Sequence, residues 1–386
     1  MSTPKNIPIL LAATDNYGVL TAVRALRAAG YAPWLAVHQT GTYVARSRAA
    51  AGTVSVPDPS SDGEGFVREL AAAAAQLSAA AVLPSVEAHL LALAGREADF
   101  AGIAFGTPSR ESVERATDKD LLPELATTVG LQTPPTKRVV RGDSEAVNTF
   151  GFPAILKPLR SRTRNADGTV SAYSAPRYVS TRQEAEEALE DLHTREGLIQ
   201  PYITGSLCSV SGVSWEGELV CALHQRSLRI WPMRVGVSSY AISIPQNAEL
   251  ERGVGRLLRK LGWSGVFQVQ FICSPKGEHY LIDLNPRIYG SIALAIAAGL
   301  NLPGIWTDLL LGKRPHVDGY RVGARFRQED KDARVLAKML MDGERLGVLQ
   351  GLVPRHATTH AIFSLRDPMP LLARAWEKST AQLWSR

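Results

Sequence analysis

Cysteine is scarce in this chain of 386 residues, which contains only Cys208, Cys221 and Cys273. Three scattered thiols do not make a disulfide framework or a thiolate metal site, and they suit a reducing compartment. Long apolar runs are absent too, since the alanine-rich stretch 70–83 is interrupted by polar residues and 291–300 is too short to cross a bilayer. The first residues lack the apolar core of a secretory signal. We therefore expect a cytoplasmic protein with no membrane partner.

Two common nucleotide-binding motifs are missing from the first hundred residues. Neither the dinucleotide fingerprint G-x-G-x-x-G nor the phosphate loop G-x-x-x-x-G-K-[ST] occurs there. This region nevertheless alternates apolar strands with helical segments, which predicts a parallel, Rossmann-like lobe. We expect any nucleotide to bind elsewhere in the chain.

Charge and composition are those of a folded enzyme. Apolar residues make up 45% and charged residues 21%, which excludes a disordered chain, and the net charge of +6 favours anionic ligands without indicating nucleic acid. The length exceeds what one hydrophobic core usually serves. Two or three lobes with a site between them are expected.

Changes in the pattern of strands, helices and charged loops divide the chain into three parts, and the fold class is expected to be mixed α/β and α+β. Residues 1–115 form the Rossmann-like part, and 116–311 form a second part with a small lobe at about 116–205 and a large lobe at about 206–311. Residues 312–386 form a C-terminal lobe or extension. We predict a helix beginning at Thr117 or Asp118, an Arg-rich strand at 320–326 and a helix over 333–341.

The most informative segment, 266–287, reads as strand, tight turn and strand. Counting outward from central turn residues Lys276 and Gly277 predicts which residues lie opposite each other. One face gathers polar side chains, paired as Gln270 with Asp283 and Gln268 with Asn285. The other face is apolar and holds Phe267, Val269, Phe271, Ile282 and Leu284.

The polar face has two possible explanations. Carboxylate and amide oxygens are ligands for Mg²⁺, which keeps part of its coordination for phosphates and water. The alternative is a solvated face of an amphipathic hairpin, but such a face would more often carry Lys, Glu and Thr. The composition of this face favours a metal site.

The segment Ile282-Asp-Leu-Asn-Pro-Arg287 resembles the ATP-grasp superfamily, whose nucleotide site ends with an acidic residue followed by Asn-Pro-Arg. The strand of Gln270 is similar to one in carbamoyl phosphate synthetase. The resemblance implies an ATP-grasp architecture with a two-lobed nucleotide-binding region, and a metal, Mg²⁺ or Mn²⁺, held by Gln270, Asp283 and Asn285. Asp283 stands where glutamate is usual.

Further segments resemble the superfamily's ATP-binding elements. Lys119 follows Asp118 in a D-K segment, and Lys157 ends a short apolar strand. Residues 159–169 occupy the place of the phosphate-covering loop. Segment 198–205 resembles the hinge that lines adenine. The resemblance implies ATP contacts at Lys119, Lys157, Arg160, Ser161, Gln200, Pro201, Tyr202 and Ile203.

Catalytic and substrate contacts follow from the same resemblance. Arg287 and Lys157 are expected to act in catalysis, and the loop 231–239 resembles one near the acceptor site of uncharacterised ATP-grasp carboligases. Surface arginines in turns are an equally good explanation for Arg234 and for the arginines of 159–169. The implied substrate contacts are Arg234, Arg287, Gly290 and Ser291.

The resemblance implies an ATP-dependent ligase that converts a carboxylate to an acyl phosphate and couples it to a small-molecule amine. One rival is a carboxylase of the biotin or purine type, which activates bicarbonate by the same step. A rival of another class is a non-catalytic ATP-binding sensor or scaffold. The expected partners are the two substrates and, in a homodimer, a second copy of the chain, but not nucleic acid.

Overall fold

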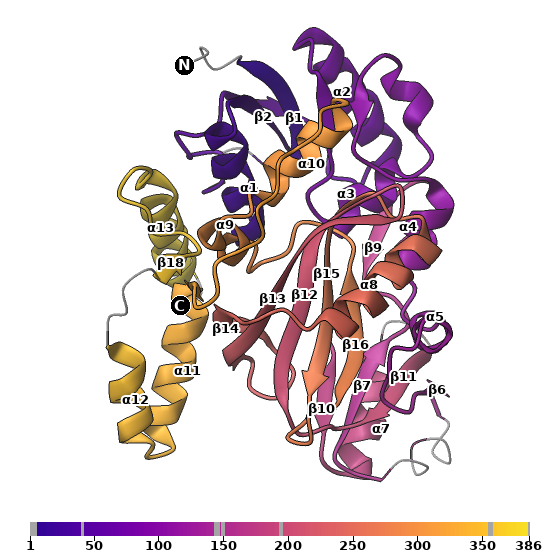
Figure 1. The fold of residues 1–386 in the computed structure, drawn as a ribbon, viewed down its shortest axis with the longest axis vertical. Coiled ribbons are helices and arrows are strands. Elements are labelled where there is room, and N and C mark those ends of the chain that lie inside the picture. Colours follow the sequence, from indigo (N-terminus) through magenta and orange to yellow (C-terminus); the bar gives the residue numbers. More distant parts are fainter. Residues whose placement is uncertain are drawn as a thin grey trace.

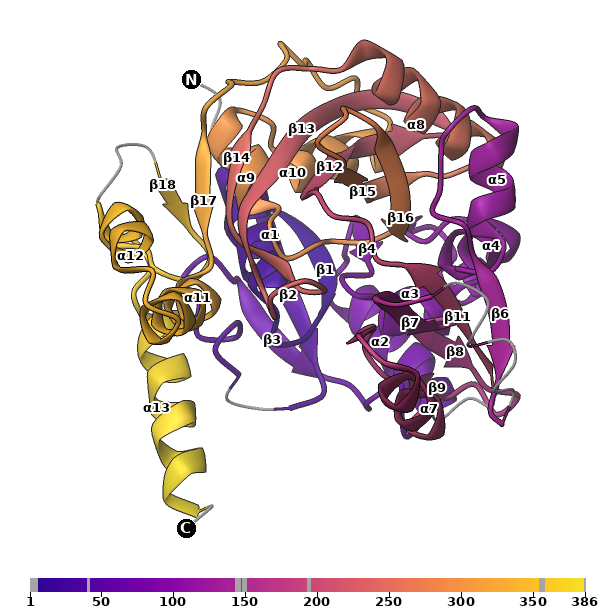
Figure 2. The same cartoon turned by 90° about the horizontal axis from the view of Figure 1, so that it is seen from below.

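The computed structural model describes residues 6–39, 42–142, 147, 151–192, 196–353 and 358–384. Figures 1 and 2 show a parallel sheet, a small antiparallel sheet and a large curved sheet, with helices around them. None of the helices within these ranges combines the length and apolar character that crossing a bilayer requires.

The first lobe is a parallel five-stranded sheet in the order β3-β2-β1-β4-β5. Strand order reverses between β1 and β4, so the loops after these two strands flank a crevice at the carboxyl edge of the sheet. Its elements are β1 (Ile7–Ala13), α1 (Tyr17–Ala28), β2 (Tyr31–Val37), β3 (Gly52–Ser55), α2 (Gly63–Gln76), β4 (Ala81–Leu83), α3 (Glu87–Leu93), a 3₁₀ turn (Glu97–Phe100), β5 (Ala104–Phe105) and α4 (Arg110–Thr117).

The second lobe is an antiparallel sheet in the order β10-β7-β11-β6, with a separate two-stranded hairpin beside it. Its elements are α5 (Leu122–Thr128), β6 (Lys137–Val140), β7 (Ala154–Pro158), β8 (Arg162–Arg164), β9 (Val170–Ala172), β10 (Arg177–Val179), α7 (Arg182–Glu190) and β11 (Glu196–Pro201).

The prediction that a helix begins at Thr117 or Asp118 is wrong. Thr117 ends α4, and its hydroxyl donates to the carbonyl of Val113 at 2.9 Å. The Asp118 carboxylate accepts from the N–H groups of Asp120 and Leu121 and holds a turn before α5 begins. Lys119 therefore lies in a turn, not on a helix.

The third sheet has seven strands in the order β16-β15-β12-β13-β14-β17-β18. Its last two strands come from the C-terminal part of the chain. The elements are β12 (Ser206–Trp215), β13 (Glu218–Trp231), β14 (Val237–Ser243), α8 (Ala248–Leu261), β15 (Gly265–Cys273), β16 (His279–Asn285), α9 (Ala293–Ala298), α10 (Leu302–Leu310), β17 (Arg325–Arg327), α11 (Glu329–Met341), α12 (Arg345–Leu352), β18 (Thr358–His360) and α13 (Met369–Trp384).

The Arg-rich strand predicted at 320–326 is confined to β17. Upstream, the backbone N–H and the guanidinium of Arg321 donate to the carbonyls of Ala298 and Ala297, both at 2.8 Å, which fixes this segment at the end of α9. The following helix begins at Glu329, before the predicted start.

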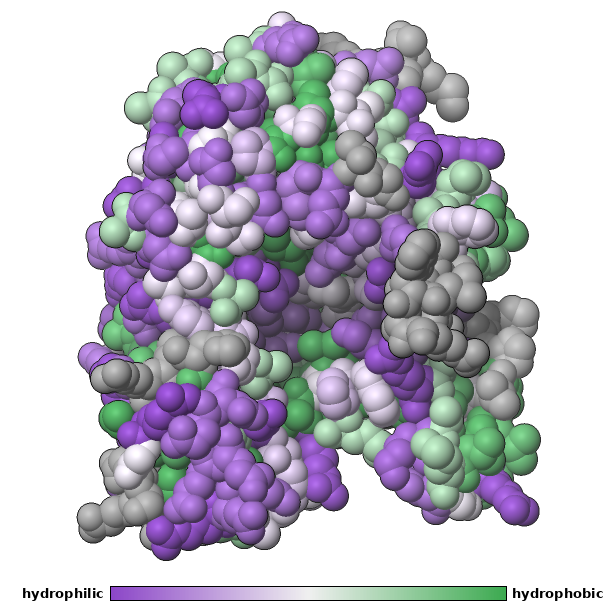
Figure 3. All heavy atoms as spheres, turned by 180° about the vertical axis from the view of Figure 1, so that it is seen from behind, coloured by the Kyte–Doolittle hydropathy of each residue, from purple (hydrophilic) through white to green (hydrophobic). Residues whose placement is uncertain are grey.

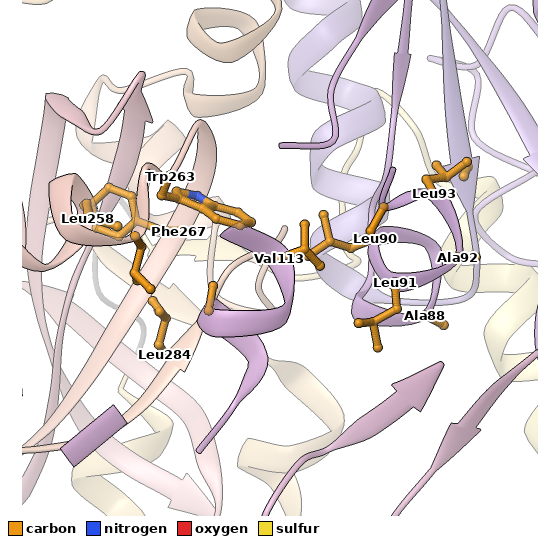
Figure 4. Packing of buried hydrophobic residues seen from close by; sticks show 14 of the residues in the cluster. Ala88, Leu90, Leu91, Ala92, Leu93, Val113, Leu258, Trp263, Phe267 and Leu284 are labelled. Carbon is orange, nitrogen blue, oxygen red and sulfur yellow. The ribbon is translucent and has the colours of Figure 1, made fainter. Parts of the chain in front are cut away.

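One hydrophobic cluster joins the first lobe to the large sheet. Figure 4 shows Val113 of α4 between the leucines of α3 on one side and Leu258 of α8, Trp263 and Phe267 of β15 on the other, with Trp263 in the connection between α8 and β15. Val113 and Phe267 are fully buried. This packing therefore fixes the position of the first lobe relative to the hairpin formed by β15 and β16.

The C-terminal segment is attached to the first lobe through Asp367, which is 5% exposed. Its carboxylate accepts from the Arg24 guanidinium at 2.8 Å, the Ser47 hydroxyl at 2.6 Å and the Arg48 N–H at 2.9 Å. We expect Asp367→Ala to lower the free energy of unfolding by about 3 kcal/mol, because Arg24 is left without its counter-charge. Urea titration followed by tryptophan fluorescence measures this, and Asp318→Ala, at an exposed position, should be neutral.

Candidate active site

A cavity of about 400 Å³ lies where the lobes meet. Figure 3 shows the molecule hollowed on one face, with hydrophilic surface along much of the rim. Every site residue predicted from the sequence lines the cavity except Arg160; these are Lys119, Lys157, Ser161, Gln200, Pro201, Tyr202, Ile203, Arg234, Gln270, Asp283, Asn285, Arg287, Gly290 and Ser291.

Arg160 lies outside this cavity because its guanidinium pairs with Asp118 at 2.6 Å. The loop after it forms the hairpin β8–β9. Arg164 on β8 donates to the carbonyl of Ala94 at 3.1 Å, so the hairpin is anchored to the first lobe. Arg160 and Arg164 thus have protein partners of their own.

The hairpin β15–β16 brings the polar residues together as predicted. Gln270 lies opposite Asp283 and Gln268 opposite Asn285. The tip is paired differently from the prediction, with Cys273 opposite His279, and a bulge on β16 restores the register before Asp283 is reached.

Because of the bulge, one residue that was predicted to lie on the apolar face of the hairpin lies elsewhere. Ile282 was expected to point into the core with Phe271 and Leu284, but it lines the cavity. Its carbonyl accepts from the ammonium of Lys157 at 3.0 Å. The extra residue therefore supplies both an apolar wall and a fixed acceptor for that lysine.

Cations surround the oxygen ligands of the hairpin. The Lys119 ammonium lies 2.9 Å from Oδ1 of Asp283, and the Arg287 guanidinium donates to Oδ1 of Asn285 at 3.0 Å. Oδ1 of Asp283 is buried, and the lysine is close but not in hydrogen-bonding geometry, so no donor satisfies this oxygen within the described chain. It is left able to bind a further positive partner.

Lys157 is 6% exposed in the interior of this group. Burial lowers the pKa of its ammonium to about 8, and the positive charge of Lys119 adds to the effect, while Asp283 opposes it. A buried lysine with a depressed pKa gains charge readily when an anion is bound.

The segment 200–203 has most of its polar groups already engaged. The Gln200 side chain donates to the Thr136 hydroxyl at 2.7 Å, and the Tyr202 N–H donates to the Pro153 carbonyl at 3.0 Å. Pro201 has no N–H. The N–H of Ile203 has no backbone acceptor among the described residues, so it is available to a planar ligand beside Ile155, Leu207, Ile272 and Ile282.

The Ser291 hydroxyl belongs to a buried amide network. It accepts from Gln225 at 3.1 Å and from Gln268 at 3.4 Å, and Gln268 also donates to Ser209. Ser291 thus lines the cavity with its hydroxyl held by the protein. Gly290 leaves the neighbouring wall without a side chain, and a Cβ there would meet nothing within 4 Å.

Sequence reasoning missed residues that other lobes contribute. Glu87, at the start of α3, is buried with no hydrogen-bond partner for Oε1 among the described residues. Burial raises its pKa, and the charges of Arg287 and Lys119 act against that. Tyr17 lines the cavity from the first lobe, and Gln328 and Lys331 line it from the segment that follows β17. No spacing in the sequence links these positions to the hairpin.

Comparison with known proteins agrees with this geometry. The family described as "ATP-grasp in the biosynthetic pathway with Ter operon" matches residues 193–331, which include the whole hairpin. In this segment the chain is similar to the ATP-grasp family. The chain is also 26% identical over 218 residues to the N-terminal section of the carbamoyl phosphate synthase large chain of Aquifex aeolicus, and this match covers 52% of the chain and 38% of the relative. The chain thus spans well under half of that relative's length.

Solved structures share the ATP-grasp architecture, as expected from the sequence. A biotin carboxylase from Campylobacter jejuni, in complex with a nucleotide, has a TM-score of 0.62 at 16% identity, covering 83% of this chain and 75% of that one. An L-amino acid ligase from Bacillus licheniformis has a TM-score of 0.58 at 15% identity, covering 79% and 74%. At these identities the likeness is one of fold.

Proposed function

We propose that this protein is an ATP-dependent ligase that activates a carboxylate as an acyl phosphate and couples it to an amine. The observation that carries the proposal is the cavity itself, in which Asp283 and two amide side chains of one hairpin lie among Lys119, Lys157 and Arg287. Such a mixture of oxygen ligands and cations suits a triphosphate with its metal.

The nucleotide would occupy the cavity from the segment 200–203 to the hairpin. The adenine ring would lie between the apolar side chains of Ile155, Leu207 and Ile282, with the Ile203 N–H as a hydrogen-bond donor. Lys119 and Lys157 would neutralise the phosphates. Arg234 and Gly290 lie on the cavity wall and are proposed to contact substrate.

The metal would be held by Asp283, Gln270 and Asn285, and it would supply charge neutralisation at the phosphates. The donor set fits Mg²⁺ in type because all three offer oxygens and Oδ1 of Asp283 is unsatisfied. No cluster of three His, Cys, Asp or Glu side chains suited to a metal occurs in the described part of the chain. With a single carboxylate, the protein needs the phosphates of ATP to complete the coordination.

The residues of the cavity suit the two steps of such a ligase. In the first, a carboxylate oxygen attacks the terminal phosphorus of ATP and ADP leaves, with Arg287 and Lys157 stabilising the charge on the transferred group. In the second, the amine attacks the acyl carbon, phosphate leaves, and the amine loses a proton.

A screen of paired amino acids and small carboxylates for ADP release tests the proposal. ADP release that requires both an acid and an amine supports it. ADP release that requires bicarbonate and no amine would instead favour a carboxylase that activates bicarbonate. The likeness of this fold to a biotin carboxylase is compatible with that function. ATP binding without turnover across the panel would favour a sensor or scaffold.

Lys157 gives a pH-dependent prediction. Below about pH 7 the ammonium is already charged, whereas above pH 8 it is largely neutral in the free protein. Bound phosphates favour the charged form, so ATP binding at pH 9 should take up about one proton, and binding at pH 6.5 almost none through this group. Calorimetry in two buffers of different ionisation enthalpy measures the uptake.

Two variants check the assignment of this proton. Lys157→Met should abolish the uptake at pH 9, and Lys276→Met, at the exposed hairpin tip, should retain it. Equal uptake in wild type and Lys157→Met would show that another group titrates.

A further inference from the structure

The first turn of α11 forms one wall of the cavity, and its three acidic residues are all engaged. Asp332 is 1% exposed, and its carboxylate accepts two hydrogen bonds from the Arg229 guanidinium, at 2.6 and 2.8 Å. Glu329 accepts from the N–H of Phe363 at 2.9 Å. None of these contacts involves the ammonium of the lysine on the same turn, Lys331.

Asp330 is engaged as well, and it connects this turn to the first lobe. Its carboxylate accepts from the Tyr17 hydroxyl at 2.8 Å and from the backbone N–H of Lys331 at 2.9 Å. The Gln328 side chain donates to it at 3.4 Å. Tyr17, Gln328 and Lys331 are thereby held together at the same end of the cavity.

The Lys331 ammonium has no direct ion-pair partner among the described residues, although the charge of Asp330 acts on it. It lines the cavity, and no hydrogen bond or ion pair of this ammonium occurs within the described ranges. Burial lowers its pKa, and Asp330 only partly offsets that effect. Arg234 also lines the cavity, and its guanidinium stacks 4.4 Å from the ring centre of Tyr178 with no carboxylate partner among the described residues. A partly buried cation without a partner is costly unless a ligand supplies the anion.

We propose that Lys331, with Tyr17 and Gln328 beside it, binds an anionic group on one of the two substrates, distinct from the carboxylate that is activated. That group is a carboxylate or a phosphate, so the substrate class is an amino acid, a dicarboxylic acid or a phosphorylated amine. The inference rests on the proposed ligase function and deepens it. It makes the C-terminal lobe part of substrate selection.

Binding measurements separate this proposal from catalysis. The affinity of amino acids, dicarboxylic acids and phosphorylated amines is measured by calorimetry, with a non-hydrolysable ATP analogue present, and each anion is paired with its neutral amide or ester. The wild-type protein should bind at least one anionic probe about tenfold or more tightly than its neutral partner. Comparing the classes shows whether the group is a carboxylate or a phosphate and which substrate carries it.

Lys331→Met should reduce that preference to near unity and leave the affinity for the ATP analogue within about twofold. Lys331→Arg should restore part of it. Lys338→Met is the matched control, since Lys338 lies on the same helix, pairs with Asp342 and is remote from the cavity lining.

Three results would overturn the proposal. They are no preference for any anion in the wild type, equal weakening of anionic and neutral probes in Lys331→Met, and weakening of the ATP analogue alone. A wild-type protein that binds the anion but never releases ADP would instead contradict the ligase function while leaving this site in place.

Discussion

Replacing Asp283 with alanine should lower substrate-dependent ADP release by about a hundredfold to a thousandfold. The variant removes the single carboxylate of the proposed metal site and leaves Lys119 without its partner at 2.9 Å. Gln270 and Asn285 are neutral, so without Asp283 they would hold Mg²⁺ too weakly for it to neutralise the charge on the phosphates. A coupled assay of ADP release over a range of Mg²⁺ concentrations measures the effect.

The matched control is Glu278→Gln in the same hairpin. Glu278 is exposed at the tip and is bonded to Ser274, so its loss should change turnover by less than about twofold. Undiminished turnover in Asp283→Ala would rule out the metal assignment, and equal losses in both variants would point to damage to the hairpin instead.

Arg287→Met should lower turnover by about a hundredfold while the affinity for ATP changes only a few-fold. The guanidinium is held by the Asn285 side chain at 3.0 Å and the Ile288 carbonyl at 3.1 Å, which fixes its direction at the cavity. A group positioned in this way contributes mainly to the transition state of phosphoryl transfer. Single-turnover kinetics and equilibrium binding of ATP separate the two effects.

Arg287→Lys distinguishes charge from geometry in the same assay. Lysine keeps the charge but loses the planar fork, so we expect partial activity between wild type and Arg287→Met. Arg259→Met, on the outer helix α8 and paired with Glu218, should behave as wild type. A loss of ATP affinity that matches the loss of turnover would mean that Arg287 serves binding alone.

Local pattern predicted the parts of the site that lie on one hairpin. Alternation along two adjacent strands fixes which side chains share a face, and this placed Gln270 opposite Asp283 without knowledge of the rest of the fold. Lys119 and Lys157 were predicted differently, from the resemblance of the short segments around them to ATP-grasp elements. The pairing within the hairpin needs only short-range geometry.

Contacts between lobes could not be predicted in this way. Tyr17, Gln328 and Lys331 reach the cavity because parts of the chain far apart in sequence pack together, and such residues carry no periodic signal for that. Arg160 was misplaced for the same reason, since its pairing with Asp118 depends on how the turn before α5 folds. The bulge at Ile282 likewise depends on the strand beside it.

That bulge makes the outer end of the hairpin independent of its inner end. The pairing of the two strands shifts by one residue at the bulge, and residues 274–278 lie wholly on its outer side. The tip is therefore a suitable place to graft a short epitope or a fluorophore attachment point. A protein labelled there should keep Gln270, Asp283 and Asn285 aligned at the cavity.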